Sequence, residues 1–231
     1  MKKFFRRFLW ICLAFLAFFV LYTLYSLFSI RDLCALAKQN PKTTAFIEQR
    51  KDDWIEKGSK RKIYQKWAPL SAISPNLRRA VIVAEDPNFY HHHGLDFYAI
   101  KLAFRHNWEE RDLEIGASTI TQQLMKNLYL SSSRNPLRKY RESILALRIE
   151  RCVTKNRILE IYLNVIEWGE STYGAEAAAR RYFKKSAAAL DSNEAALLAA
   201  MIPNPKVLNP LKKNRQLYKR QQRILRRMSR R

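Results

Sequence analysis

The longest run of hydrophobic positions lies near the N-terminus and predicts a membrane-spanning helix. Residues 8–30 contain no charged side chain. As a helix they would extend roughly 35 Å, enough to cross a hydrocarbon core of about 30 Å. Four basic residues precede the run: Lys2, Lys3, Arg6 and Arg7. Because basic flanks favour the cytoplasmic side, we expect residues 1–7 in the cytoplasm and the chain after Arg31 across the membrane.

A cleaved signal peptide is the alternative interpretation of this run. The run exceeds the apolar core of a usual signal peptide, and the only A-x-A match near its end spans Ala35 to Ala37. Both observations favour a retained transmembrane anchor.

Beyond the anchor, the pattern divides the chain into a connector, a domain and a tail. Residues 31–66 are charged and irregular, with a proline, a glycine and a basic run, which is typical of a connector. Residues 67–211 have mainly helical periodicity, scarce strand-like alternation and no internal repeat. We therefore predict one mainly α domain there, followed by a basic tail over residues 212–231.

One helix of the domain places a carboxylate at its C-terminal end. Ser74 is an N-cap candidate, and Pro75 suits the first position of a helix. Pro87 ends this helix, so we expect Glu85 at its C-terminal end. The negative end of the helix dipole disfavours ionisation there. Burial against the aromatic residues that follow would also raise the pKa of Glu85, toward the range of a general base. An exposed glutamate without a task is the alternative.

Two later helices have clear signals. Apolar residues spaced i, i+3, i+4, i+7 predict a helix over residues 155–164. Asp191 and Glu194 form a capping-box pattern before a run of Ala and Leu that Pro203 ends.

The tail contains ten Lys or Arg and no acidic residue. Its apolar residues are spaced to share one helix face: Leu217, Ile224, Leu225 and Met228. A basic amphipathic helix of this kind suits an anionic membrane surface. A solvated or frayed tail is the alternative.

Composition adds a strong positive charge. The chain has 43 Lys and Arg against 20 Asp and Glu, a formal net charge of +23. This balance points to an anionic partner, namely nucleic acid, an acidic bilayer or a phosphorylated substrate.

The three cysteines show no disulfide framework or metal-ligand spacing. Cys12 lies inside the predicted anchor, and Cys34 and Cys152 lie outside it. Unreactive thiols are the favoured interpretation, and a Cys34–Cys152 disulfide in an oxidising compartment stays open.

A polar helix start and a cluster of cations follow Glu85 along the chain. Gly116 and Ala117 predict a turn, and Ser118 an N-cap whose helix would offer free N–H groups to a phosphate. Four cations then crowd toward Glu142: Arg134, Arg138, Lys139 and Arg141. This density of cations suits a pyrophosphate. A solvated charged face is the alternative.

Three consecutive histidines, His91 to His93, suggest a metal site. Successive side chains diverge, however, and no second Cys or His cluster completes a site. We therefore expect structural or hydrogen-bonding roles, above all for His92.

Taken in order and spacing, these motifs resemble the monofunctional biosynthetic peptidoglycan transglycosylases, stand-alone relatives of the glycosyltransferase domain of bifunctional penicillin-binding proteins. The resemblance runs from about Trp67 to Pro210 and rests on five segments. They are Glu85-Asp86-Pro87-Asn88-Phe89 through Asp96, residues 116–123 with Lys126-Asn127, Arg138-Lys139 with Glu142, Lys155 through Glu160 to Tyr162-Leu163-Asn164, and Tyr182-Phe183 with the Glu194 helix. Ala117 stands where the family often has a second glycine.

The resemblance implies a lysozyme-like, mainly helical fold with two lobes around a cleft, the smaller lobe contacting the membrane. It implies that the enzyme polymerises lipid II into β-1,4-linked glycan with inversion, releasing undecaprenyl pyrophosphate. The implied partners are lipid II, the growing strand, an anionic membrane surface and other cell-wall synthesis proteins, and no nucleic acid. The implied location is the bacterial cytoplasmic (inner) membrane, in a single pass with the catalytic domain outside the cytoplasm.

The resemblance also implies roles for particular residues. Glu85 would deprotonate the 4-hydroxyl of the acceptor sugar. Lys126 and Arg134 would hold the pyrophosphate, and Glu142 would organise this leaving group with Lys139, or indirectly through a divalent cation (Mg²⁺ or Mn²⁺). The remaining residues that would shape the substrate cleft are Ser118, Gln122, Gln123, Asn127 and Arg138. No organic cofactor is expected.

The sequence is also compatible with two other functions. A lysozyme-like enzyme with a catalytic glutamate could cleave glycan, and a membrane-tethered basic scaffold would also explain the charge. Peptide cross-linking is not expected, because Ser59 to Lys62 fits Ser-x-x-Lys only by chance and the other two transpeptidase motifs are missing.

Overall fold

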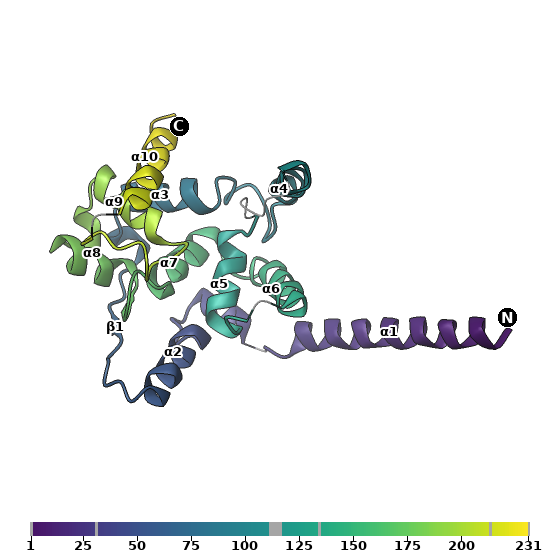
Figure 1. Cartoon of the computed structure of the whole chain (residues 1–231). Coiled ribbons are helices and arrows are strands. Elements are labelled where there is room, and N and C mark those ends of the chain that lie inside the picture. The colour runs from purple at the N-terminus through teal and green to yellow at the C-terminus, as the bar shows by residue number, and fades with distance from the viewer. Residues whose placement is uncertain (1, 31, 111–116, 134, 213, 231) are drawn as a thin grey trace.

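The computed structural model is mainly helical, as the sequence predicted (Figure 1). It describes residues 2–30, 32–110, 117–133, 135–212 and 214–230. The α-helices are α1 (Lys2–Phe28), α2 (Ala45–Glu56), α3 (Pro75–Glu85), α4 (Phe97–Glu110), α5 (Ile120–Tyr129), α6 (Pro136–Ile149), α7 (Lys155–Val165), α8 (Ala175–Phe183), α9 (Ser192–Met201) and α10 (Arg215–Ser229). Short 3-10 helices are η1 (Leu33–Ala37), η2 (Leu70–Ala72) and η3 (Ala187–Ala189). Strands β1 (Tyr64–Gln65) and β2 (Thr172–Tyr173) pair in parallel.

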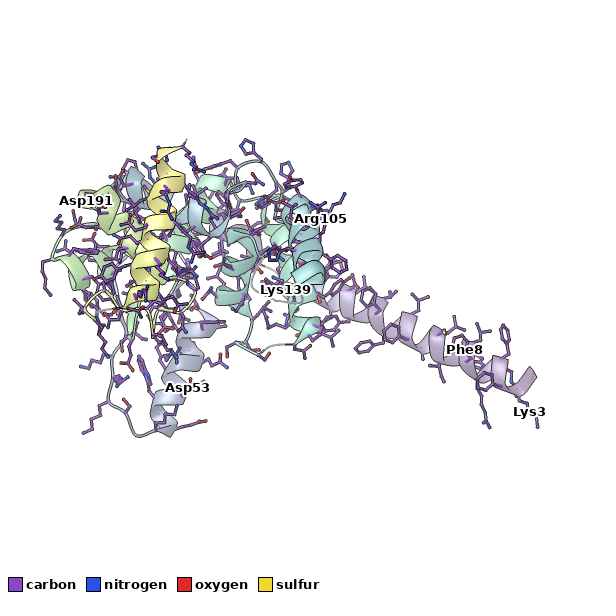
Figure 2. The ribbon with its side chains drawn as sticks, turned by 45° about the horizontal axis from the view of Figure 1, so that its top comes forward. Lys3, Phe8, Asp53, Arg105, Lys139 and Asp191 are labelled. Atoms are coloured by element: carbon purple, nitrogen blue, oxygen red, sulfur yellow. A yellow bond between two sulfur atoms is a disulfide. The ribbon has the colours of Figure 1, made fainter. Side chains whose placement is uncertain are left out.

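Helix α1 projects away from the rest of the molecule (Figures 1 and 2). Residues Lys3–Phe28 form one segment of 26 residues that is long and apolar enough to cross a membrane. Its large apolar side chains, such as Phe8, are exposed. A continuous exposed apolar surface of this size is typical of a segment that lipid covers. The helix is therefore a candidate membrane anchor.

The last turns of α1 rest on α6, the helix that carries the predicted cation cluster. The Tyr22 hydroxyl donates to the carbonyl oxygen of Leu137 at 3.0 Å, and the Thr23 and Tyr140 hydroxyls lie 2.9 Å apart. The rings of Phe19 and Tyr140 also pack, with centroids 4.9 Å apart. The end of the anchor therefore sets the position of α6 relative to any membrane that α1 crosses.

The core of the domain forms around α7 and α9, and the helical signals predicted for both are confirmed. Helix α7 buries Ile158, Ile161 and Tyr162 completely, and Thr154 caps it. Helix α9 has the predicted capping box, in which Asp191 and Glu194 each accept from the other's backbone N–H. Its Ala and Leu residues are buried on nearly every side, so α9 is a central helix of the core.

The segment expected to be an irregular connector contains ordered helices. Thr44 caps α2 by accepting from the N–H of Ile47, and α2 buries Ile47 and Trp54 against the domain. The sequence reasoning weighed the charges and the proline of this stretch above these apolar positions. Burying two large side chains stabilises α2 by more than its unfavourable composition costs.

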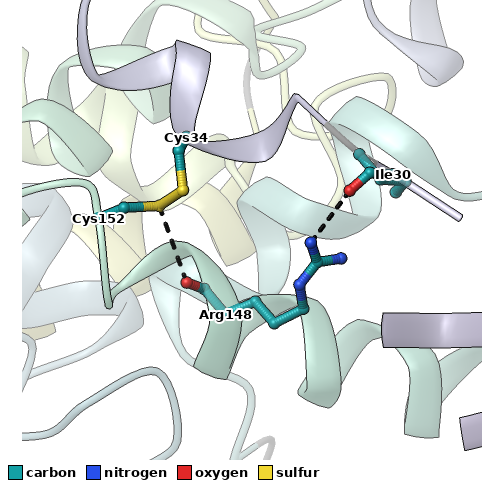
Figure 3. Close-up of a disulfide and its surroundings, with 4 residues drawn as sticks. All are labelled: Ile30, Cys34, Arg148 and Cys152. Atoms are coloured by element: carbon teal, nitrogen blue, oxygen red, sulfur yellow. Dashed lines mark hydrogen bonds between the residues drawn. A yellow bond between two sulfur atoms is a disulfide. The ribbon is translucent and has the colours of Figure 1, made fainter. Parts of the chain in front are cut away.

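A disulfide joins Cys34 in η1 to Cys152, which follows α6 (Figure 3). The two Cα atoms are 5.5 Å apart. Nearby, Arg148 donates to the carbonyl oxygen of Ile30 at 3.1 Å, at the base of the anchor. The favoured prediction of unreactive thiols was wrong, because no local spacing reveals a contact between residues 118 positions apart.

Removing this disulfide is expected to destabilise the domain. Cross-linking a loop of this length restricts the unfolded chain, which is worth about 5 kcal/mol by loop-entropy arithmetic. We expect the double substitution Cys34→Ser/Cys152→Ser to lower the free energy of unfolding by roughly that amount in urea denaturation. A reductant should destabilise the wild type to the same degree and leave the double variant unchanged. An unaffected wild type in reductant would contradict the expectation.

The basic tail forms helix α10, which packs on α9 and α3 on the side of the domain away from α1 (Figure 1). Leu217, Ile224 and Met228 are buried in this contact. The predicted amphipathic helix is thus present, but protein covers its apolar face. A membrane could contact only its basic face, and the alternative of a frayed tail is wrong.

Candidate active site

Glu85 is the last residue of α3, the position predicted from Pro87. Its Oε2 accepts a hydrogen bond from Nε2 of Gln123 on α5 at 2.9 Å. Oε1 of Gln123 in turn accepts from the Tyr162 hydroxyl on α7 at 2.7 Å. Because an ionised carboxylate only accepts hydrogen bonds, Glu85 fixes the Gln123 amide with its NH₂ group toward the carboxylate, and the Tyr162 hydroxyl then donates to the amide oxygen. Three helices therefore orient one carboxylate.

Burial is the main cause that raises the pKa of Glu85, and the negative charge of Asp86 acts in the same direction. The hydrogen bond from Gln123 and the positive charge of Arg220 on α10 oppose this rise. Glu85 is partly exposed where it lines a cavity, and protein surrounds it on its other sides. A raised pKa is what the sequence predicted, although the opposing effect of Arg220 was not expected. The carboxyl is therefore suited to proton transfer nearer neutral pH.

Replacing Arg220 with Gln should move the acid limb of the pH–rate profile to higher pH. A general base works in its ionised form, and Arg220 stabilises that form of Glu85. Without this charge the pKa of Glu85 rises further, so that a higher pH is needed for the same fraction of active enzyme. The measurement is kcat/KM against pH. Arg226→Gln, at an exposed position of the same helix, is the matched control. An acid limb that stays in place in Arg220→Gln would contradict the assignment.

Asp86 ties the end of α3 to the start of α5. Both of its carboxylate oxygens lie 3.0 Å from Nε2 of His92, and Oδ2 accepts from the N–H of Ile120 at 2.9 Å. The hydrogen-bonding role expected for His92 is thus confirmed. Because Asp86 is buried and adjoins Glu85, these contacts fix the backbone from which Glu85 projects.

A cavity of about 360 Å³ opens beside Glu85. Four other predicted site residues line it: Ser118, Gln123, Lys126 and Asn127. The cavity wall also includes Phe46, Tyr162 and Glu167. A carboxylate and an ammonium group therefore border the same space, although they lie 41 positions apart in the sequence.

Glu142 lies behind this cavity at the centre of a cation cluster on α6. It is 2% exposed. Its Oε2 accepts from Arg138 at 2.7 Å and its Oε1 from Lys139 at 2.5 Å. Lys139 also donates to Ser118 Oγ at 2.7 Å, which connects the cluster to the cavity wall. Glu142 therefore orients Lys139 and Arg138.

The surroundings of Glu142 do not fit a directly bound divalent cation. Arg138 and Lys139 already engage its two oxygens. The described residues contain no group of three or more His, Cys, Asp or Glu that could hold a metal ion. We assign no step to a metal here, and the expected Mg²⁺ or Mn²⁺ stays a prediction.

The start of α5 differs from the prediction. Thr119, not Ser118, caps the helix, in a capping box with Gln122. The first turn is buried, with the N–H groups of Ile120 and Gln122 donating to Asp86 and Thr119, so it offers no open phosphate site. Gln122 donates to Ser143 and braces α6 instead of lining the cavity. Two Ser/Thr residues in sequence left the capping residue ambiguous.

Two predicted residues, Gly116 and Arg134, lie outside the described residues. The sequence analysis did not identify three residues near the site: Phe46, Arg220 and Glu167. Phe46 lies in the predicted connector, Arg220 in the predicted tail, and Glu167 in a segment assigned to no element. Apolar positions over residues 45–56 could have indicated the helix that carries Phe46, but no local pattern reveals that Arg220 acts on Glu85.

Comparisons with known proteins agree with this arrangement. The sequence profile of a family described as Transglycosylase matches residues 52–229. The chain belongs to the transglycosylase family. Among its relatives, the "Biosynthetic peptidoglycan transglycosylase" of Nitrosospira multiformis is 45% identical over 82% of this chain and 83% of the relative. The proteins of the same name from Thiobacillus denitrificans and Laribacter hongkongensis are 52% and 42% identical, over 72% and 82% of this chain and 72% and 83% of the relatives.

Membership of the transglycosylase family confirms the resemblance found in the motifs, and with it a glycosyltransferase of mainly helical, lysozyme-like fold. The match begins inside α2 and ends at the last residue of α10, so it extends beyond the predicted domain of residues 67–211 at both ends. Helix α10 and the second half of α2 thus belong to the matched region.

Proposed function

We propose that this transglycosylase family member polymerises lipid II, with Glu85 as the general base. The observation that carries the proposal is the shared cavity, in which the carboxylate of Glu85 and the ammonium group of Lys126 border one space. A base and a fixed cation on the two sides of a bound sugar are what transfer from a pyrophosphate leaving group requires.

In the proposed step, the acceptor's 4-hydroxyl gives its proton to the Glu85 carboxylate as its oxygen forms a bond to C1 of the donor. The bond between C1 and the pyrophosphate oxygen breaks, and the pyrophosphate leaves with the electron pair. The attack comes from the face opposite the leaving group, so the configuration at C1 inverts. The Gln123–Tyr162 pair holds the base in place for this attack.

The leaving group gains negative charge as the bond breaks, and fixed cations stabilise that charge. Lys126 lines the cavity, and Lys139 stands next to it through Ser118. We assign both to the pyrophosphate, together with Arg134, and Glu142 to the orientation of Lys139. Ser118, Gln123 and Asn127 would contact the sugars from the cavity wall.

The proposed location has the N-terminus in the cytoplasm and the domain on the outer face of the bacterial cytoplasmic membrane. The basic residues before α1 support this orientation. The Cys34–Cys152 disulfide supports it independently, because such bonds persist in oxidising compartments. Exposed aromatic residues of α4, Phe97, Tyr98 and Phe104, suit contact with the membrane on the side from which α1 emerges (Figure 1).

Separate incubations of the purified chain with lipid II and with finished peptidoglycan test the proposal. We expect lipid II to be converted to long glycan strands while mature strands keep their length. Shortening of mature strands without polymer from lipid II would instead establish a lytic enzyme. The family membership already favours an enzyme over a basic scaffold.

A further inference from the structure

Helix α2 contributes a wall to the catalytic cavity, although much of it precedes the region that matches the family. Phe46 lines the cavity together with Glu85 and Lys126. The Lys126 ammonium lies over the face of the Phe46 ring, 5.3 Å from its centroid. The two side chains come from different helices, α2 and α5, and meet at the wall of the cavity.

The position of Phe46 is fixed by its own helix. Thr44 caps α2 two residues earlier, and Ile47 and Trp54 are buried against the domain. Arg50, one turn after Phe46, donates to Glu167 at 3.1 Å, and Glu167 is another residue of the cavity wall. The helix is thus joined to the cavity at two points, and Phe46 is held over Lys126 by more than one contact.

We propose that Phe46 is a positioning residue that holds the Lys126 ammonium toward the leaving group. This inference rests on the proposed role of Lys126 in binding pyrophosphate. An aromatic face attracts an ammonium group without neutralising its charge, so the cation stays available to an anion. A lysine side chain loses much rotamer freedom when it is ordered. With Phe46 in place that loss occurs before the substrate binds, and the site is preorganised.

The aromatic face makes this role distinguishable from simple space filling. Phe46→Leu keeps an apolar side chain but removes the ring, whereas Phe46→Tyr keeps the ring. Ile55→Leu is the matched control, because Ile55 lies on the same helix and is 75% exposed. Each substitution is made in the full-length chain, and thermal unfolding checks that the variants remain folded.

The experiment measures two quantities at physiological salt: the dissociation constant for inorganic pyrophosphate, and kcat/KM for lipid II polymerisation. We expect Phe46→Leu to weaken pyrophosphate binding and to lower kcat/KM, each about two- to tenfold. Phe46→Tyr should stay within about twofold of the wild type, and Ile55→Leu should match it. In a Lys126→Gln background, Phe46→Leu should cause no further loss, because the ring then has no ammonium to position.

Equal losses from Phe46→Leu in the two backgrounds would overturn the inference, as would pyrophosphate binding that Phe46→Leu leaves unchanged. Lys126→Gln alone separates the two proposals. If it reduces pyrophosphate binding but shows no coupling to Phe46, only the positioning role of Phe46 is wrong. If Lys126→Gln changes neither pyrophosphate binding nor kcat/KM, the assignment of Lys126 to the leaving group is wrong. The positioning role of Phe46 is then wrong as well.

Discussion

Replacing Glu85 with Gln is expected to lower the rate of lipid II polymerisation by about 10²- to 10⁴-fold, the range that general base catalysis contributes. The amide is almost the same size as the carboxylate and can still accept from Gln123, so the hydrogen-bonded chain to Tyr162 should survive. What is lost is the ability to take the proton of the acceptor's hydroxyl. Polymerisation assays on purified wild type and variant measure the effect.

The stability of the same variant provides an independent check. Burial raises the pKa of Glu85 in the folded state, so the stability that this group contributes is present at low pH and is lost as the pH rises through the folded-state pKa. Glu85→Gln removes that dependence. We expect the variant to be at least as stable as the wild type at neutral pH, and relatively less so in acid.

A variant that polymerised lipid II at the wild-type rate would refute the base assignment.

The sequence predicted the parts of the site that local rules govern. Pro87 ends α3, and this alone placed Glu85 at a helix terminus. Apolar spacing located α7 and a capping box located α9, because both patterns depend on residues within one or two turns. The uncharged run at the N-terminus needed only its length to predict α1. In each case the decisive interaction lies within a few residues of the pattern.

The rest depends on contacts between distant segments. Phe46 and Lys126 meet because α2 packs on α5. The charge of Arg220 lowers the pKa of Glu85 because α10 packs on α3. Composition suggested a connector and a membrane-binding tail for these two segments, since both are rich in charge. Tertiary burial of a few apolar residues, such as Trp54 and Leu217, outweighed that composition. A single sequence does not reveal which surfaces such residues will meet.

Glu142→Gln is expected to lower the polymerisation rate by about ten- to a hundredfold, less than Glu85→Gln. Glu142 does not line the cavity beside Glu85, but its two oxygens accept from Arg138 and Lys139, and Lys139 donates to Ser118 on the cavity wall. With a neutral amide, Lys139 loses its charged partner and is less well fixed beside the leaving group. Removing one preorganised group that stabilises developing charge typically costs about 10²- to 10³-fold, and the remaining cations should reduce this loss.

The same substitution should also lower stability by about 2 kcal/mol, because it removes a buried carboxylate that accepts charge-assisted hydrogen bonds from Arg138 and Lys139. Glu160→Gln separates the two effects, since Glu160 also pairs with an arginine of its own helix, Arg157, but does not line the cavity. We expect Glu160→Gln to destabilise the domain with little change in rate per folded molecule. If Glu142→Gln behaved in the same way, Glu142 would support only the fold. A rate loss confined to Glu142→Gln would instead show that orienting Lys139 is a requirement of the chemistry.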